Sequence, residues 1–149
     1  MTPEATAAEA LFTSWCAGWV SRDHQERLRH LQACCADDLV FVPGDSRPVL
    51  HGWRALADHI TAYTARWPAG VTAELAAPPE SHHGWCRGYI RWTFPHAVAV
   101  GCDIARIDGG KIATMVVFVE TTANVEAVAA ALSPSRAAAP PESPERHGT

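Results

Sequence analysis

The chain has 149 residues, which is enough for one domain with a single hydrophobic core. Apolar residues make up 48% of it and charged residues 19%, as in an ordinary globular protein. The formal net charge of −4 excludes the broad basic surface that nucleic-acid binding needs, and no apolar run approaches the roughly 20 residues that span a bilayer. We therefore expect a single domain that contacts neither nucleic acid nor a membrane.

Two features bear on the cellular compartment. The start of the chain, Met1-Thr2-Pro3-Glu4, is acidic and lacks the basic residues that open a signal peptide. The cysteines form no C-x-x-C pair and mostly lie in apolar stretches, where a free cysteine behaves as a small hydrophobic residue; they are Cys16, Cys34, Cys35, Cys86 and Cys102. We expect a cytoplasmic protein whose cysteines are reduced and structural.

Three helices are predicted in the first half of the chain. Apolar residues spaced three and four apart predict an amphipathic helix from about Glu4 to Val20. A second helix is expected from Arg22 to about Cys35, with Ser21 as its N-cap. A third follows Gly52 and ends at Pro68, with an apolar stripe formed by Trp53, Leu56, Ile60, Tyr63 and Trp67.

The strands are predicted mainly in the second half. Leu39 to Val42 is a short early strand that Pro43-Gly44 stops, and Val71 to Leu75 is a second one. Three longer strands follow, joined by the tight connections Pro95-His96 and Asp108-Gly109-Gly110, and they run from Trp85 to Phe94, from Ala97 to Ile107 and from Lys111 to Glu120. This pattern predicts an antiparallel meander.

The end of the chain differs in composition. Asn124 to Leu132 is predicted to form a last short helix, and residues 133–149 contain Pro, Ala, Ser and charges with nothing to bury. We therefore expect a domain over residues 1–132 and a disordered Pro/Ala-rich tail over 133–149. The order of elements predicts an α+β fold, in which a strongly curved antiparallel sheet packs about three helices from the first half against its concave face. Three helices cannot fill such a sheet completely, so a pocket is expected.

The predicted strand from Ala97 to Ile107 contains the most informative acidic residue. Side chains alternate faces along a strand, so one face of it carries Ala97, Ala99, Gly101, Asp103 and Ala105. With a two-residue hairpin, Trp92 lies opposite Ala99 and Gly88 lies opposite Asp103. A carboxylate in such apolar surroundings has a raised pKa, which suits a general acid or base. Periodicity alone equally allows a solvated face with Asp103 as an ordinary surface acid.

The remaining candidate site residues lie mostly on the predicted helices. His51 and His59 are placed to exchange protons with Asp103, although each also fits a surface position. The six tryptophans either fill a core or line a cavity. For an aromatic wall around a flat substrate we select Trp15, Trp19, Phe41, Trp53, Trp92 and Phe118, with the Tyr63 hydroxyl as a partner for a substrate oxygen. No histidine spacing matches a metal site, so we expect neither a metal nor another cofactor.

Several short motifs occur in a distinctive order. The first half has a helix carrying Trp15 and Trp19, then Ala36-Asp37-Asp38-Leu39-Val40-Phe41-Val42-Pro43 and His51-Gly52-Trp53-Arg54-Ala55-Leu56. The second half has Arg91-Trp92, Gly101-Cys102-Asp103, Asp108-Gly109-Gly110-Lys111-Ile112 and a closing strand with Phe118. Over about residues 8 to 121 the sequence resembles the SnoaL-like polyketide cyclase family of the nuclear transport factor 2-like superfamily.

This resemblance implies a cone-shaped α+β fold, usually without a cofactor and often in a homodimer. It also implies that Asp103, in its Gly-x-Asp strand, points into the cavity. Gly101 occupies the place of the arginine that limonene-type epoxide hydrolases need, and no second strand acid accompanies Tyr63 and Tyr89 as in steroid isomerases. The fold alone does not select the reaction.

We therefore expect a cofactor-free acid–base enzyme of the cyclase or isomerase type in natural-product biosynthesis. Its substrate would be a polyketide-like or other polycyclic small molecule held in an aromatic pocket. Hydrolase and dehydratase activities remain open. Two alternatives are a non-catalytic protein that binds an aromatic ligand, and a structural dimer whose sheet face serves a protein partner.

Overall fold

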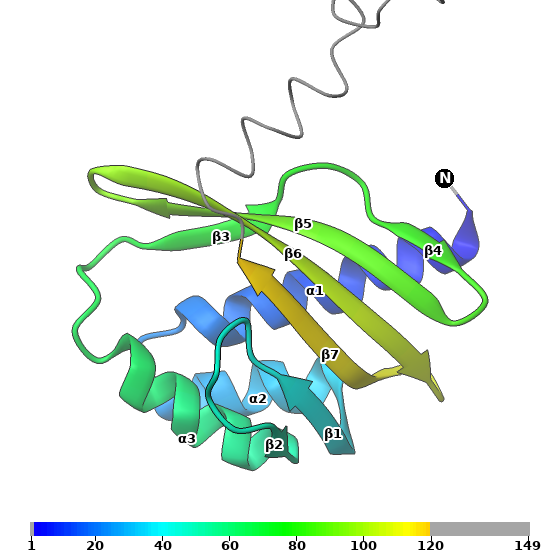
Figure 1. Ribbon diagram of the computed structural model, residues 1–149, viewed down its shortest axis with the longest axis horizontal. Coiled ribbons are helices and arrows are strands. Elements are labelled where there is room, and N and C mark those ends of the chain that lie inside the picture. Colours follow the sequence, from blue (N-terminus) through cyan, green and yellow to red (C-terminus); the bar gives the residue numbers. More distant parts are fainter. Residues whose placement is uncertain (1, 120–149) are drawn as a thin grey trace, which may run out of the picture. The chain divides into compact units, whose positions relative to one another are not determined.

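The computed structural model describes residues 2–119, which form an α+β unit (Figure 1). It contains three helices, α1 (Pro3–Val20), α2 (His24–Cys34) and α3 (Trp53–Thr64). The strands are β1 (Cys35–Val42), β2 (Leu50–His51), β3 (Thr72–Leu75), β4 (Glu80–His82), β5 (Trp85–Phe94), β6 (Ala97–Asp108) and β7 (Lys111–Val119). The helix predicted over Asn124 to Leu132 and the predicted tail over 133–149 lie outside the described residues.

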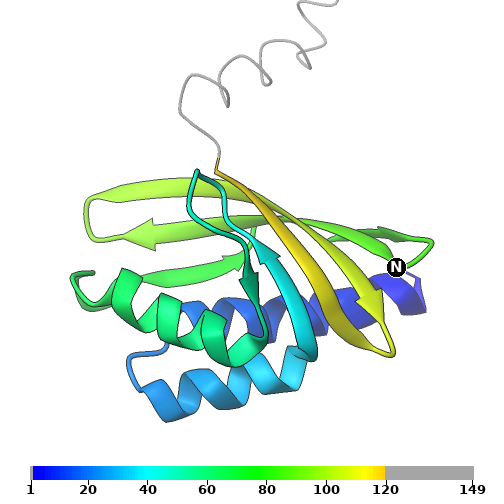
Figure 2. The same cartoon turned by 60° about the horizontal axis from the view of Figure 1, so that its bottom comes forward.

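One curved sheet contains all of these strands, in the order β2-β1-β7-β6-β5-β3, with β4 also paired to β5. The three helices lie together on one face of the sheet (Figure 2). The predicted meander is confirmed for β5, β6 and β7, and the predicted register is confirmed because Trp92 pairs with Ala99 and Gly88 with Asp103. The α+β fold class is therefore as expected.

The pairing of β1 with β7 differs from the prediction of a purely antiparallel sheet. These two strands are parallel, with Phe41 opposite Met115 and Val42 opposite Val116. Parallel neighbours require a long crossover, and here the chain passes through α3 and the whole meander before it returns beside β1. Such a pairing has no local turn signal in the sequence.

The hydrophobic core lies between the helices and the sheet. Fully buried side chains come from every layer and include Phe12, Trp15, Leu31, Leu39, Leu56, Ile60, Ile90, Ile112 and Met115. Gly88 on β5 lets α1 approach the sheet, because a Cβ at this position would lie only 3.0 Å from Cζ of Phe12. Burial of these side chains supplies the main driving force for the fold.

Element ends show where the sequence prediction was wrong. Ser21 does not cap the second helix, because its backbone N–H donates to the Ala17 carbonyl and so completes α1. Asp23 is the N-cap instead, and its carboxylate accepts from the Glu26 backbone N–H at 3.0 Å. The third helix ends at Thr64, so Trp67 lies in the following turn, and the short strands β2 and β4 were not predicted.

None of the helices in the described part of the chain is both long and apolar enough to cross a membrane.

Candidate active site

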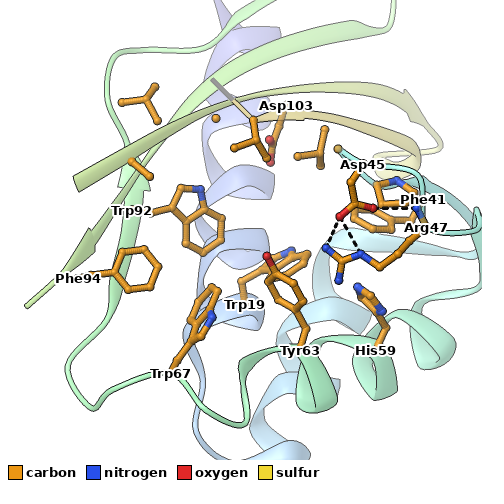
Figure 3. A pocket seen from close by; sticks show the side chains of 17 residues that line it. Trp19, Phe41, Asp45, Arg47, His59, Tyr63, Trp67, Trp92, Phe94 and Asp103 are labelled. Carbon is orange, nitrogen blue, oxygen red and sulfur yellow. Dashed lines mark hydrogen bonds and ion pairs between the residues drawn. The ribbon is translucent and has the colours of Figure 1, made fainter. Parts of the chain in front are cut away.

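A pocket of about 180 Å³ opens on the helical side of the sheet (Figure 3). Its wall is formed by α1, α3, the inner face of β5–β7 and the loop that follows β1. The aromatic lining residues are Trp19, Phe41, Tyr63, Trp67, Trp92 and Phe94, and the charged or titratable ones are Asp45, Arg47, His59 and Asp103. The pocket therefore combines an apolar interior with few polar groups, as small-molecule sites do.

Asp103 is the buried acid of this pocket. Alternation along β6 turns Ala99, Gly101 and Asp103 inward, and only 2% of the Asp103 surface is exposed. Its Oδ2 accepts a hydrogen bond from Nε1 of Trp15 at 3.0 Å. A Cβ at Gly101 would lie 3.7 Å from Oδ1 of Asp103, so the missing side chain leaves that oxygen open toward the pocket.

The surroundings of Asp103 change its acidity. Burial raises the pKa of this carboxyl from an ordinary 3.8 to about 7, against the opposing effect of the hydrogen bond from Trp15, which favours the carboxylate. A group with this pKa is present in both protonation states near neutral pH. It can therefore act either as a proton acceptor or as a proton donor near neutral pH.

Replacing Trp15 by Phe is expected to raise the pKa of Asp103 further, because the carboxylate loses its hydrogen-bond donor while the ring remains. The measurement is a pH titration of the Asp103 carboxyl carbon by NMR with ¹³C-labelled aspartate. Trp19→Phe is the matched control, since Nε1 of Trp19 makes no hydrogen bond within residues 2–119. An unchanged midpoint in Trp15→Phe would contradict the role assigned to this hydrogen bond.

Edge-to-face aromatic contacts build one continuous wall of the pocket. Trp19 meets Trp92 with ring centroids 5.8 Å apart and an interplanar angle of 81°, and Trp92 meets Trp67 at the same distance and 78°. Trp67 then contacts Phe94 at 5.2 Å. Such geometry places ring edges against ring faces and stabilises each pair by about 0.5–1.5 kcal/mol beyond burial. The wall is suited to a flat, ring-containing ligand.

The mouth of the pocket carries a charged pair beside an aromatic stack. Arg47 and Asp45 form an ion pair on the loop after β1, and Cζ of Arg47 lies 4.4 Å from the centroid of the Tyr63 ring. The His59 ring also stacks on the Tyr63 ring, with the two ring centroids 5.8 Å apart. Burial, and then the positive charge of Arg47, lower the pKa of His59, so its imidazole is neutral at pH 7.

The structure brings six of the predicted site residues together in the pocket wall: Trp19, Phe41, His59, Tyr63, Trp92 and Asp103. Trp15 lies behind the pocket in the core, where it contacts the lining residues Asp103, Trp19 and Phe41. Trp53 is also in the core, and its Nε1 donates to Oδ1 of Asp37 at 3.2 Å. These two residues therefore shape the site without lining it.

The remaining two predicted site residues lie away from the pocket. His51 lies on β2 opposite Val40, before α3 begins, and its side chain is exposed. Phe118 is 52% exposed and belongs to the outer sheet face, since its neighbours Val117 and Val119 line the pocket. Neither residue is positioned to contact a ligand in this pocket.

Sequence reasoning missed the Asp45–Arg47 pair and the far end of the aromatic wall. The pair lies directly after the Pro43-Gly44 stop, in the segment over residues 45–48, where no site residue was predicted. Two opposite charges directly after a strand that contributes to a pocket are a signal that could have identified it. Trp67 and Phe94 were assigned to elements but not to the site, because their approach depends on the curvature of the sheet.

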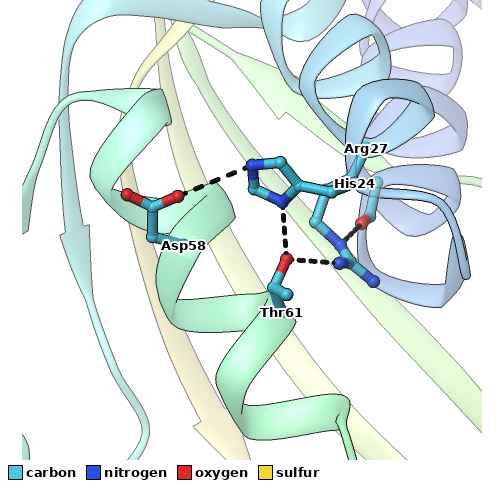
Figure 4. A network of polar contacts seen from close by, with 5 residues as sticks. His24, Arg27, Asp58 and Thr61 are labelled. Atoms are coloured by element: carbon cyan, nitrogen blue, oxygen red, sulfur yellow. Dashed lines mark hydrogen bonds and ion pairs between the residues drawn. The ribbon is translucent and has the colours of Figure 1, made fainter.

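A second polar cluster lies outside the pocket, between α2 and α3 (Figure 4). Arg27 is buried there, and its guanidinium donates to the Gly18 carbonyl at 2.9 Å and to Oγ1 of Thr61 at 2.6 Å. Oγ1 of Thr61 is also hydrogen-bonded to Nδ1 of His24 at 2.7 Å, and Nε2 of His24 lies 3.6 Å from Oδ1 of Asp58. This cluster satisfies a buried cation and joins α2 to α3 and to the end of α1.

Thr61→Val is expected to destabilise the fold by about 1–3 kcal/mol, because the substitution removes the hydroxyl that pairs with the buried Arg27 guanidinium. Thr61→Ser keeps the hydroxyl and is the matched control, with a much smaller expected loss. Denaturant unfolding of both variants measures the difference. Equal stability of the Val and Ser variants would show that the hydrogen bond contributes little.

The chemistry available in the pocket is proton transfer in apolar surroundings. Asp103 is the titrating group, and Tyr63, Arg47 and neutral His59 are hydrogen-bonding groups at the mouth. Within residues 2–119 no group of three or more His, Cys, Asp or Glu side chains is arranged to hold a metal ion.

Comparison with known proteins gives matches in structure only. No protein-family model matches the sequence, and no curated protein is significantly similar to it. An inferred isomerase of the SnoaL-like family from Agrobacterium tumefaciens is 24% identical with a TM-score of 0.68, and the match covers 78% of this chain and 99% of that one.

Two further solved structures are more distant in sequence. An inferred SnoaL-like polyketide cyclase from Jannaschia sp. CCS1 is 12% identical with a TM-score of 0.66, covering 90% of this chain and 96% of that one. An inferred ketosteroid isomerase from Kribbella flavida is 12% identical with a TM-score of 0.60, covering 78% and 80%. At these identities the likeness concerns the fold. The chain therefore has the same fold as these SnoaL-like and ketosteroid isomerase structures.

Proposed function

We propose that the protein is a cofactor-free acid–base enzyme of the isomerase or cyclase type. Its substrate is a flat, ring-containing small molecule of the polyketide or polycyclic kind, and its biological setting is natural-product biosynthesis. The reaction is the removal of a proton from an acidic carbon and its return at the same or another position. Asp103 is the group that carries this proton.

One observation supports this proposal above the others: a carboxyl with a pKa of about 7 stands at the inner wall of an aromatic pocket. Burial of an acid costs stability, and a protein that only binds an apolar ligand has no need of it. Perturbed acids in pockets are characteristic of functional sites. Orientation of the ligand by the aromatic wall adds to the rate, because the reacting carbon and Oδ1 of Asp103 are held together.

The size and opening of the pocket are compatible with such a ligand. The cavity of about 180 Å³ holds one end of a ring system, and the exposed residues Asp45, Arg47 and Tyr63 mark the side where the rest can extend into solvent. Solved structures with the same fold bear the names of inferred isomerases and of a SnoaL-like polyketide cyclase. These names support the class of reaction proposed here.

The test is hydrogen–deuterium exchange at the acidic carbon of ring ketones. The purified protein is incubated in D₂O with 2-tetralone and larger polycyclic ketones, and deuterium uptake is followed by mass spectrometry. Exchange that saturates with ketone and disappears in Gly101→Val, whose side chain fills the space beside Asp103, supports the proposal. Saturable binding, seen as tryptophan quenching, without exchange above the buffer rate would instead support a ligand-binding protein.

We also propose that the protein is a homodimer. The outer face of the sheet carries an apolar surface formed by Tyr89, Val98 and Phe118. These side chains are 39%, 63% and 52% exposed, respectively. Analytical ultracentrifugation tests this: wild type should sediment as a dimer and Phe118→Asp as a monomer. A monomeric wild type would overturn it.

The cysteines support a reducing compartment, and we propose the cytoplasm. All five are buried and none forms a disulfide, which is the state expected in a reducing environment.

A further inference from the structure

The pocket contains a cationic side chain, Arg47, which has no part in the proton transfer by Asp103 described above. Arg47 is the only Lys or Arg among the described residues that line the cavity. It lies on the loop after β1, whereas Asp103 belongs to β6, so the two groups approach the ligand space from different walls (Figure 3). A ligand bound along the aromatic wall therefore has an acidic group at one side and a guanidinium at another.

The guanidinium is held in place by its surroundings. Oδ2 of Asp45 accepts from Nε of Arg47 at 2.8 Å and also from Nη2, while Oδ1 of Asp45 accepts from the Arg47 backbone N–H at 2.9 Å. The plane of the group lies over the Tyr63 ring, with Cζ 4.4 Å from the ring centroid. Because the side chain is already held in one position, it loses less conformational entropy when it binds a ligand oxygen.

The ion pair leaves one edge of the guanidinium outside it. Asp45 contacts Nε and Nη2, so Nη1 carries hydrogens that point away from the carboxylate. The hydrogen bonds to Asp45 raise the pKa of Arg47, so the cation persists at every accessible pH. Arg47 and Tyr63 both line the cavity and form a polar end of it.

The charges of Arg47 and Asp45 together determine whether this end of the pocket favours a carboxylate or a carbonyl oxygen of a ligand. The hydrogen bonds from Arg47 lower the pKa of Asp45 to about 2, so Asp45 is ionised near neutral pH and balances the charge of Arg47. A ligand with a permanent carboxylate would lie close to the Asp45 carboxylate and be repelled by it. A neutral carbonyl oxygen accepts a hydrogen bond without this repulsion.

We propose that Arg47 is a specificity-determining residue that binds the carbonyl oxygen of a neutral ring ketone, in preference to a ring carboxylic acid. This inference rests on the proposed function. The Asp103 carboxylate removes a proton from the carbon beside the carbonyl, the C–H electron pair becomes the new C=C bond, and the carbonyl π pair moves onto oxygen. Arg47 keeps its hydrogen bond to this oxygen during the step, and the Asp103 carboxylic acid returns the proton to carbon. Asp45 is a positioning residue that acts through Arg47.

Three bicyclic probes of similar size test the inference. They are 2-tetralone, which has a ketone oxygen, tetralin, which has none, and 2-naphthoate, which has a carboxylate. Affinities for wild type and Arg47→Met are measured by tryptophan quenching, with thermal unfolding as the check on folding. We expect Arg47→Met to weaken 2-tetralone binding by about 10-fold or more, as for loss of a hydrogen bond to a charged group, and to leave tetralin unchanged.

Asp45→Asn supplies an independent readout. It removes the repelling carboxylate and leaves Arg47, so the preference for 2-tetralone over 2-naphthoate should reverse or disappear. Equal weakening of 2-tetralone and tetralin in Arg47→Met would mean that Arg47 only packs against the ligand and would overturn the inference. Failure of 2-tetralone to bind wild type more tightly than 2-naphthoate would also overturn it.

Deuterium exchange measured in the same samples separates this inference from the proposed function. A selective loss of 2-tetralone affinity in Arg47→Met without any exchange in wild type would keep the oxygen-binding role and reject the enzyme. Exchange that depends on Asp103 but is indifferent to Arg47 would keep the enzyme and reject Arg47.

Discussion

Replacing Asp103 by Asn is expected to lower the rate of ketone proton exchange by about 10²–10⁴-fold, the contribution that a positioned general acid or base makes. Asn has nearly the same shape, and its carbonyl oxygen can still accept the hydrogen bond from Trp15. It cannot take up a proton, so binding should persist while exchange is lost. The measurement is deuterium uptake by 2-tetralone under saturating ketone, with affinity determined by tryptophan quenching.

Asp108→Asn is the matched control for this substitution. Asp108 ends the same strand, β6, but its side chain is 74% exposed and lies outside the pocket. The Asp108→Asn variant should catalyse proton exchange of the ketone at the wild-type rate. Undiminished exchange in Asp103→Asn would remove Asp103 from the mechanism, and equal loss in both variants would point to a general effect of charge.

The stability of the protein is expected to fall as the pH rises from about 4 to about 7. The pKa of Asp103 is raised from 3.8 to about 7 in the folded protein, so over this interval the folded state keeps a proton that the unfolded chain releases. The free energy of unfolding therefore decreases through this window and loses no more from Asp103 above it. Because one pKa unit corresponds to about 1.4 kcal/mol, the total loss is on the order of 4 kcal/mol.

Asp103→Asn isolates this contribution from those of other titrating groups. Near pH 4 the variant and wild type should have similar stability, since the wild-type carboxyl is then neutral in the folded protein. At pH 8 the variant should be the more stable of the two, because it buries no charge. Urea unfolding at both pH values measures the difference. A constant difference across the range would mean that Asp103 titrates normally.

The register of the central hairpin could be predicted because local chemistry determines it. The two-residue connection Pro95-His96 sets the pairing of β5 with β6, and strict alternation then turns Asp103 to the same side as Ala99 and Gly101. This is why the prediction that Asp103 stands among apolar neighbours agrees with the structure. The parallel pairing of β1 with β7 had no such local determinant, and it was not predicted.

The prediction of site residues was least accurate where the curvature of the sheet decides whether a side chain lines the pocket. An aromatic residue on a helix or strand faces either the core or the cavity, and Trp15 and Trp53 proved to be core residues. Phe118 lies on a strand whose facing was not tied to a hairpin register in the prediction. The Asp45–Arg47 pair joins the pocket because its loop folds over α3, which no periodicity encodes.

The proposed proton transfer depends most directly on the acidity of Asp103. The decisive measurement is an NMR titration of its ¹³C-carboxyl resonance in the wild-type protein, assigned by its absence in Asp103→Asn. We predict a midpoint near pH 7, where burial in the pocket wall keeps the group half protonated. A midpoint near 4 would mean a solvated carboxylate, and it would contradict both the buried acid and the proton transfer built on it.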